Sequence, residues 1–275
     1  MNQTNAVRIG IAGLGRSGWD IHAKLLETLK DKYRVTAVLD SNPARLKQAK
    51  RRFHCKTYTS YDDFLKDGST ELVTIAMPSH LHAPYTLQAL KAGKNVVCEK
   101  PMATTLNDAE RMIQCARKTG RLLTVFQNRR YGSDFLQVRK VIESGKLGRI
   151  VQIRMTGHEF TRRWDWQTLK RCGGGTLRNK GPHLLDRAMV FFGEKKPKVF
   201  CIRDRVLSLG DADDHVKVIL HGAGSPTVEV EISSASAYCQ DAWFVMGSQG
   251  GLHGTPRRLS WKYCDPASLP ARTLS

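Results

Sequence analysis

The sequence predicts an α/β protein of two domains, in which a doubly wound parallel sheet is followed by an α+β domain with an open, mainly antiparallel sheet. Three observations lead to this fold class. Predicted strands and helices alternate over the first 127 residues, a glycine-rich turn follows the first strand, and strands dominate after residue 198. With 275 residues, 41% of them hydrophobic, the chain is long enough for two cores. We place the domains at residues 1–127 and 128–275.

The first domain is defined by regular alternation of strand and helix. Its predicted strands cover residues 7–13, 33–39, 55–58, 72–77, 95–98 and 122–126, and its predicted helices cover 17–30, 43–53, 61–66, 82–92 and 106–118. The first helix places Trp19, Ala23 and Leu26 at steps of three and four. Pro43 suits the first turn of the second helix, and Gly93 suits the end of the fourth. Six strands joined by helical crossovers predict a complete parallel sheet.

The second domain has a different pattern of elements. Two helices are predicted, over 132–144 and 183–192, on either side of a glycine loop at 173–175. The predicted strands cover residues 150–156, 199–206, 215–220, 227–233, 243–246 and 259–263. Consecutive strands separated by turn residues predict antiparallel pairing. Leu259, Trp261 and Tyr263 alternate in the last strand, so one of its faces is apolar, and we expect this sheet to mediate a homo-oligomer, either a dimer or a tetramer.

The chain is strongly basic, with 44 Lys and Arg against 25 Asp and Glu and a net charge of +19. The excess is spread evenly, +9 over residues 1–127 and +10 over the rest. Nucleic-acid-binding proteins usually gather basic residues on one face with aromatic platforms, so we expect no nucleic-acid partner. No uncharged apolar run reaches the ~18 residues of a membrane span, so no membrane partner is expected. The start, MNQTNAVRIG, does not have the pattern of a leader peptide, and we expect a cytoplasmic protein.

The cysteine and histidine patterns do not indicate a metal centre. The seven cysteines are scattered, odd in number and without a CxxC spacing, so neither a disulfide framework nor a zinc cluster is expected. His80 and His82 form an HxH pair, but no cysteine or carboxylate accompanies them. Together with Pro78 they follow the fourth predicted strand, and contact with a cofactor is the preferred interpretation.

A dinucleotide-binding turn is the strongest local motif. Residues 13–18 read GLGRSG, which fits GxGxxG, and they join the first strand to the first helix. Gly13 permits the tight turn, Gly15 lets the backbone approach a pyrophosphate, and Gly18 lets the helix pack on the strand. Arg16 and Ser17 lie between these glycines, at the start of the helix, whose partial positive charge suits phosphate.

Asp40 ends the second predicted strand, 22 residues after Gly18. A carboxylate at this place accepts hydrogen bonds from the adenosine ribose and repels a 2′-phosphate, so NAD is favoured over NADP as the cofactor. Ser41 and Arg45 argue the other way, because they could cradle that phosphate if Asp40 turned away.

A second motif, Cys98-Glu99-Lys100-Pro101, follows the fifth predicted strand. Open α/β sheets bind their ligands at the carboxyl ends of the strands, so Lys100 can reach into the ligand crevice. The alternative is a solvated lysine without a catalytic role, which is the usual fate of lysine after a strand.

Taken together, the motifs resemble the glucose–fructose oxidoreductase / inositol 2-dehydrogenase / MocA family of nicotinamide-dependent oxidoreductases, nearly from end to end. The resemblance rests on residues 13–18 (GLGRSG), 77–82 (MPSHLH), 89–94 (ALKAGK), 96–101 (VVCEKP), 144–148 (SGKLG), 173–177 (GGGTL) and 181–186 (GPHLLD). The EKP and GGG…GxHxxD elements at this separation are specific to the family.

This resemblance implies an amino-terminal Rossmann domain that binds NAD or NADP and a second domain that covers the nicotinamide with a sugar pocket. Lys100 corresponds to the family's EKP lysine, which hydrogen-bonds the reacting hydroxyl or carbonyl, and the lysyl-prolyl bond is cis in many members. His183 corresponds to the family's second-domain histidine, which is a general base toward the alcohol or an acid toward the ketone. Without the resemblance, a lone histidine at a helix start is more often structural.

Two departures from the family pattern bear on the site. Many members have aspartate four residues before this histidine, whereas this chain has Asn179. Asparagine can hydrogen-bond a substrate but cannot take a proton, so we expect an altered substrate preference rather than an inactive enzyme. Relatives usually continue well past residues 259–263 with another helix and strand, which leaves three alternatives for this chain: a natural short form, a truncated product or a part of a longer protein.

Residues expected to bind the substrate cluster before and within the glycine loop. Arg163 and Trp166 lie in the segment RRWDW, where an indole can stack on a sugar ring and a guanidinium can bind hydroxyls. Packing of the tryptophans against the sheet is an equal alternative. Arg178 and Lys180 flank Asn179 and favour an acidic or phosphorylated sugar-like substrate.

We therefore expect an NAD(P)-dependent oxidoreductase that transfers hydride between the nicotinamide and a secondary alcohol or ketone of a sugar, cyclitol or related polyol. Two alternatives stay open: an NAD-dependent glycoside hydrolase of the same family, and a non-catalytic dinucleotide-binding regulator. The expected catalytic residues are Lys100, His183 and Asn179. The expected cofactor contacts are Gly13, Gly15, Arg16, Ser17, Gly18, Asp40, Arg45, Pro78, His80, His82, Glu99 and Lys100.

Overall fold

The chain divides into two compact units, Met1–Phe126 and Gln127–Ser275. The structure is a computed structural model that describes residues 6–270. Each unit has a hydrophobic core of its own. No helix within residues 6–270 combines the length and the apolar composition that a membrane span requires.

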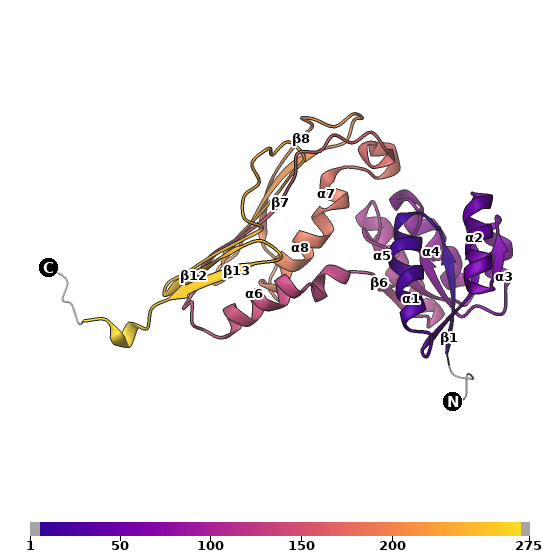
Figure 1. Ribbon diagram of the computed structural model, residues 1–275, viewed down its shortest axis with the longest axis horizontal. Helices are drawn as coiled ribbons and strands as arrows, with labels where there is room; N and C mark the ends of the chain where they lie inside the picture. The colour runs from indigo at the N-terminus through magenta and orange to yellow at the C-terminus, as the bar shows by residue number, and fades with distance from the viewer. Residues whose placement is uncertain (1–5, 271–275) are drawn as a thin grey trace. The chain divides into compact units, whose positions relative to one another are not determined.

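The first unit is a parallel sheet with helices on both faces (Figure 1). Its six strands lie in the order β3-β2-β1-β4-β5-β6, and every neighbouring pair is parallel, which confirms the predicted doubly wound sheet. The strands are β1 (Val7–Ala12), β2 (Tyr33–Leu39), β3 (Lys56–Tyr58), β4 (Leu72–Ile75), β5 (Asn95–Cys98) and β6 (Leu123–Val125). The helices are η2 (Ser17–Ala23), α1 (Lys24–Thr28), α2 (Pro43–Phe53), α3 (Tyr61–Lys66), η3 (Ser79–Leu81), α4 (His82–Lys91) and α5 (Leu106–Thr119).

Alternating side chains of the strands divide this core between the two faces of the sheet. Ile9 and Ile11 of β1 pack with Leu46 of α2 on one face. Leu90 of α4 and Met112 of α5 are fully buried on the other. Because the strand order runs outward from β1 in both directions, the turn after β1 lies at the topological switch point, where such sheets bind their ligands.

The helix predicted over 17–30 differs from the one observed. Ser17–Ala23 forms a π-helix, and α1 continues from it for only five residues. The N–H of Lys24 donates to the carbonyl of Trp19, five residues earlier, so the first turns are wider than those of an α-helix. The apolar spacing at positions 19, 23 and 26 fits both helix types closely enough that it could not separate them.

The second unit is built on a seven-stranded sheet in the order β13-β12-β11-β7-β10-β9-β8. All its neighbouring strands are antiparallel except β7 and β10, so the mainly antiparallel prediction is confirmed. The strands are β7 (Ile150–His158), β8 (Lys198–Asp204), β9 (His215–His221), β10 (Thr227–Ser233), β11 (Trp243–Gly247), β12 (Gly250–Gly254) and β13 (Leu259–Tyr263). The helices are η4 (Asn128–Tyr131), α6 (Ser133–Glu143), η5 (Trp166–Thr168), η6 (Lys170–Cys172), α7 (Thr176–Asn179), α8 (Gly181–Val190) and η7 (Pro266–Ser268).

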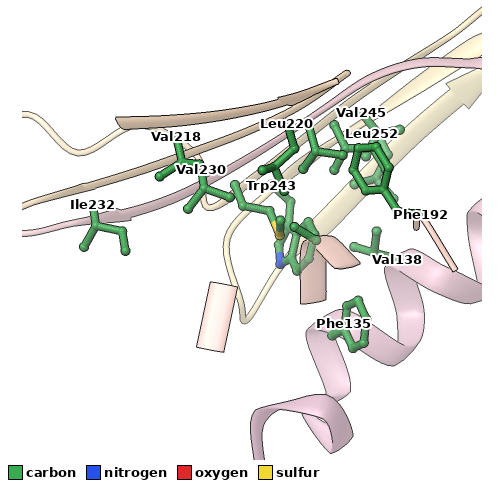
Figure 2. Close-up of a cluster of buried hydrophobic side chains, with 14 of the residues drawn as sticks. Phe135, Val138, Phe192, Val218, Leu220, Val230, Ile232, Trp243, Val245 and Leu252 are labelled. Carbon is green, nitrogen blue, oxygen red and sulfur yellow. The ribbon is translucent and has the colours of Figure 1, made fainter. Parts of the chain in front are cut away.

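One face of this sheet packs against α6 and α8 to form the core. Figure 2 shows side chains of the sheet, among them Val218, Val230 and Trp243, directed toward Phe135 and Val138 of α6. All five are almost completely buried. This packing gives the helix that carries His183 a rigid support.

Strand β12, helix α7 and the four short 3₁₀ helices of the second unit are absent from the sequence prediction. Strand β12 reads GGLHG, and its three glycines lower the strand propensity so far that the segment looks like a turn. Helix α7 has only four residues, which is too short for helical periodicity to be visible. Trp261 of β13 pairs with the buried Leu252 of β12 and so lies on the same face of the sheet, but it is 42% exposed.

Candidate active site

The glycine turn after β1 has the geometry that a dinucleotide requires. Gly13 has a φ of 95°, a conformation that other residues rarely adopt. A Cβ on Gly18 would lie 1.8 Å from the carbonyl oxygen of Gly13, so the helix can approach the turn only with glycine there. A Cβ on Gly15 would meet nothing within 4 Å, which leaves the space beside this backbone open to a pyrophosphate.

Asp40 is buried at the end of β2 and is bonded to the glycine turn. Its Oδ2 accepts the N–H of Leu14 at 2.7 Å, and its Oδ1 accepts the N–H of Asn42 at 2.8 Å. Arg45, on the exposed first turn of α2, places Nη1 3.5 Å from Oδ2. A carboxylate has about four acceptor positions, so Asp40 can still receive a ribose hydroxyl. Arg45 reduces the charge with which it would repel a 2′-phosphate.

Glu99 and His22 form a buried pair beneath the lysine motif. His22 Nε2 lies 3.0 Å from Glu99 Oε1, and both side chains are almost fully buried. Burial raises the pKa of Glu99, but the hydrogen bond and charge of His22 outweigh it and hold this pKa below its usual value. The other carboxylate oxygen accepts the N–H of Lys100 at 3.1 Å. Glu99 therefore fixes the backbone of Lys100, whose bond to Pro101 is cis.

His82 joins the two loops that follow β4 and β5. Its Nδ1 lies 2.6 Å from the carbonyl oxygen of Pro101, and its Nε2 lies 2.8 Å from that of Met77. Burial lowers the pKa of His82, although the two carbonyls act in the other direction. The side chain is only 1% exposed, which favours a positioning role over the direct cofactor contact that we expected. His80 is exposed and Pro78 is half-buried in the same loop.

In the second unit, the three glycines at 173–175 let the chain pack tightly against η5. Gly173 and Gly175 have φ values of 71° and 108°. A Cβ on Gly174 would lie 2.4 Å from the carbonyl oxygen of Gln167, and the N–H of Gly175 donates to that same oxygen at 2.8 Å. The turn leads directly into α7, which ends at Asn179.

Gln167 is a contact of the candidate site that the sequence did not reveal. The Nδ2 of Asn179 donates to Gln167 Oε1 at 2.9 Å. Gln167 is held in turn by its neighbour Asp165, whose Oδ1 accepts the N–H of Gln167 at 3.1 Å. The amide of Asn179 thus has a neutral amide partner. The only available sequence signal was the position of Gln167 next to Trp166, in the segment already expected to bind substrate.

Asp213 holds the start of α7 from the opposite side. Its Oδ2 accepts the N–H of Leu177 at 2.8 Å, and its main-chain carbonyl accepts the N–H of Thr176 at 2.8 Å. Its Oδ1 accepts two hydrogen bonds from Arg203, at 2.6 and 3.2 Å. Asp213 is buried, and no sequence motif singled it out because its partners lie 10 and 36 residues away.

Helix α8, which carries His183 in its first turn, is fixed by a buried arginine. Arg187 donates to both carboxylate oxygens of Asp134 at 3.1 Å and to the main-chain carbonyl of Arg129 at 2.9 and 3.1 Å. The indole N–H of Trp243 donates to the same carboxylate at 3.0 Å. Fixed contacts of this kind hold the helix that carries His183 in one orientation relative to the sheet.

The segment expected to bind sugar is largely open to solvent. Trp164 is 77% exposed and Trp166 is 37% exposed, so Trp164 does not pack against the sheet. Arg163 forms an ion pair with Asp165. Lys180 pairs with Glu159 at 2.6 Å, which weakens the positive potential that we expected beside Asn179. Within residues 6–270, no three metal-ligating side chains gather in one place.

The contacts of Asp40 predict the cofactor preference. We expect the chain to bind NADH more tightly than NADPH, since the carboxylate charge is reduced by Arg45 but not removed. Arg45→Ala should weaken NADPH binding roughly fivefold, which corresponds to about 1 kcal/mol of binding free energy, and should therefore widen the preference for NADH. Calorimetric titration with both cofactors measures this. Arg51→Ala, also on α2, is the matched control, and tighter NADPH than NADH binding by the unaltered chain would contradict the expectation.

The contacts of Asp213 predict a separate effect on the second unit. Asp213→Ala should lower the free energy of unfolding by about 1–3 kcal/mol, because it leaves the half-buried N–H of Leu177 and the guanidinium of Arg203 without their acceptor. Turnover should fall, while NADH affinity should stay unchanged because the glycine turn belongs to the other unit. Urea unfolding and fluorescence titration measure the two quantities. Asp265→Ala removes a similar but exposed cap from η7 and is the control; equal behaviour of the two variants would refute the role of Asp213.

Comparison with known proteins identifies the family. Residues 7–127 match the oxidoreductase family with an NAD-binding Rossmann fold, and residues 135–253 match the GFO/IDH/MocA carboxy-terminal domain. Inositol 2-dehydrogenase of Rhizobium meliloti is 30% identical over 260 residues, which are 92% of this chain and 76% of that protein. Myo-inositol 2-dehydrogenase of Thermotoga maritima is 29% identical over 254 residues, which are 90% and 74%.

Solved structures show the same fold. The WlbA dehydrogenase of Bordetella pertussis, whose structure contains NADH and UDP-GlcNAcA, superposes with a TM-score of 0.85 at 24% identity and covers 96% of this chain and 85% of its own. The two family matches together account for most of the sequence, from the glycine turn to β12. The chain therefore belongs to the glucose–fructose oxidoreductase / inositol 2-dehydrogenase / MocA family of NAD(P)-dependent oxidoreductases.

Proposed function

We propose that this oxidoreductase acts on a secondary alcohol or ketone of a sugar, cyclitol or related polyol. The observation that carries the proposal is the fixed position of Lys100 after β5, where Glu99 binds its N–H in a domain that also has a dinucleotide turn. Relatives named as inositol 2-dehydrogenases support the polyol class.

The residues of the first unit fit a nicotinamide dinucleotide. The N–H groups of the glycine turn and the open space beside Gly15 suit the pyrophosphate, and Asp40 suits the adenosine ribose. Arg16 is exposed and Ser17 half-buried at the start of η2, where both can reach the phosphates. A bound nicotinamide dinucleotide would supply the hydride acceptor for oxidation of the alcohol or the hydride donor for reduction of the ketone.

The chain's own side chains handle the substrate oxygen and its proton. The ammonium of Lys100 donates a hydrogen bond to the oxygen and stabilises the negative charge that develops on it. His183 removes the hydroxyl proton during oxidation and returns it during reduction. Asn179, oriented by Gln167, hydrogen-bonds a substrate hydroxyl. In the oxidation, His183 thus takes the hydroxyl proton, and the hydride of the same carbinol carbon would go to the bound nicotinamide, so that the oxidation is balanced.

We also propose that the chain forms a homo-oligomer through the sheet of the second unit. On the face opposite α6 and α8, Phe200 and Ile202 of β8 are 58% and 47% exposed. Between them and Met246 of β11, Lys217 bridges Glu229 and Glu231. Large apolar side chains exposed on one face of a sheet are typical of a surface that pairs with another protein surface.

Replacement of Lys100 tests the proposed function. Lys100→Ala should keep the fold and NADH binding but lose on the order of 2–4 kcal/mol of transition-state stabilisation, because a charge-assisted contact with the reacting oxygen is lost. The measurement is kcat/KM over a polyol panel, followed by NADH absorbance. Lys91→Ala on α4 is the control. Undiminished kcat/KM in Lys100→Ala would show an ordinary surface lysine, and sugar release from a nitrophenyl glycoside without added NAD would favour the glycosidase alternative.

The pH dependence tests the role of His183. A histidine base must be neutral to accept a proton, so the oxidation rate should rise with pH through the neutral range. His183→Ala should abolish this rise and lower kcat by roughly 10²–10⁴. Asn179→Asp should shift the rise to higher pH, because a carboxylate favours the imidazolium. A pH–rate profile that His183→Ala leaves unaltered would assign the proton transfer to another group.

A further inference from the structure

We propose that a cavity in the second unit binds a phosphate ester or diphosphate group of the substrate, an inference that rests on the proposed function. The cavity has a volume of about 630 Å³. It lies between the segment that leads into α7 and the loop that follows β8. Four basic and three acidic side chains line it: Lys170, Arg178, Arg203, Arg205, Asp204, Asp211 and Asp213.

The acidic side chains of the cavity are occupied by other contacts. Asp213 is bound to Arg203 and to the N–H of Leu177. Asp211 accepts the main-chain N–H of Lys170 at 2.8 Å, and Asp204 accepts that of Arg205 at 2.7 Å. These carboxylates therefore serve mainly to hold the walls of the cavity together.

The four basic and three acidic side chains give the lining of the cavity a net charge of +1. Among the residues that the structure describes, neither Lys170 nor Arg205 forms an ion pair with a carboxylate. Arg205 donates from Nη1 to the carbonyl of Gly210 at 2.8 Å, which fixes its guanidinium and leaves other donors for a ligand. A concave site with net positive charge concentrates anions, and a guanidinium matches the oxygens of a phosphate group.

The cavity adjoins the loop that we assign to the substrate. Arg178 lines the cavity, and the next residue, Asn179, is the proposed substrate contact. Asp213 joins the two places, because it binds Arg203 in the cavity wall and the N–H of Leu177 in α7. An anion in the cavity can therefore belong to the molecule that Asn179 contacts. The volume lies in the usual range for small-molecule sites and exceeds what a single carboxylate fills.

Calorimetric titration of the whole chain with inorganic pyrophosphate tests the cavity. The double variant Lys170→Met/Arg205→Met should weaken pyrophosphate binding at least tenfold. Lys196→Met/Arg257→Met removes the same charge from exposed positions outside the cavity and should change it less than about twofold. Equal affinity in the unaltered chain and the cavity variant would overturn the proposal, as would an equal loss in both variants, which would indicate a general charge effect.

A second arm separates a substrate group from a free anion. With NAD present, the unaltered chain should have a higher kcat/KM for a sugar phosphate than for the matching neutral sugar, and the cavity variant should lose this advantage through KM with kcat retained. Pyrophosphate binding without such an advantage would indicate a site for free anions and overturn the substrate assignment. If no sugar were oxidised, the proposed function would fail, whereas the calorimetry would still decide whether the cavity binds oxyanions.

Discussion

Hydrogen bonds from main-chain N–H groups to buried carboxylates hold the loops of the candidate site in place. Asp40 holds the glycine turn through Leu14, Glu99 holds Lys100, and Asp213 holds the start of α7 through Leu177. A carboxylate that accepts such bonds is worth more than a neutral acceptor, and its loss would leave a buried N–H without a partner. The loops are therefore fixed by side chains outside the motifs that a sequence search recognises.

This use of carboxylates also bears on the charge of the chain. Acidic residues are few, and several of them are buried in contacts within the fold, among them Asp40, Asp67, Glu99, Asp213 and Asp214. Their charges contribute little to the potential at the surface, whereas most lysines and arginines are exposed. Because several negative charges are buried, positive charge predominates at the surface even more than the net charge of +19 indicates.

The sequence was sufficient for the features that depend on local pattern. The parallel sheet, the glycine turn and most strands of the second unit follow from periodicity and from glycine and proline positions, and the structure has them. Strand β12 was missed because its glycines give the segment a low strand propensity. It forms a strand because it pairs with β11 and β13. Gln167 and Asp213 were missed because their roles depend on contacts between segments 12 and 36 residues apart, which no local pattern encodes.

The hydrogen bond from the N–H of Leu14 to Asp40 constrains how this enzyme could change its cofactor during evolution or engineering. The usual exchange toward NADP replaces the acidic residue at the end of the second strand. Here the same carboxylate ties down Leu14 in the glycine turn, so its removal would disturb pyrophosphate binding for either cofactor. Substitutions at positions 41 and 45, which leave that bond intact, offer the route with the smaller penalty. A substitution at position 40 would therefore change the cofactor preference and the order of the glycine turn together. Substitutions at neighbouring positions could change the cofactor preference alone.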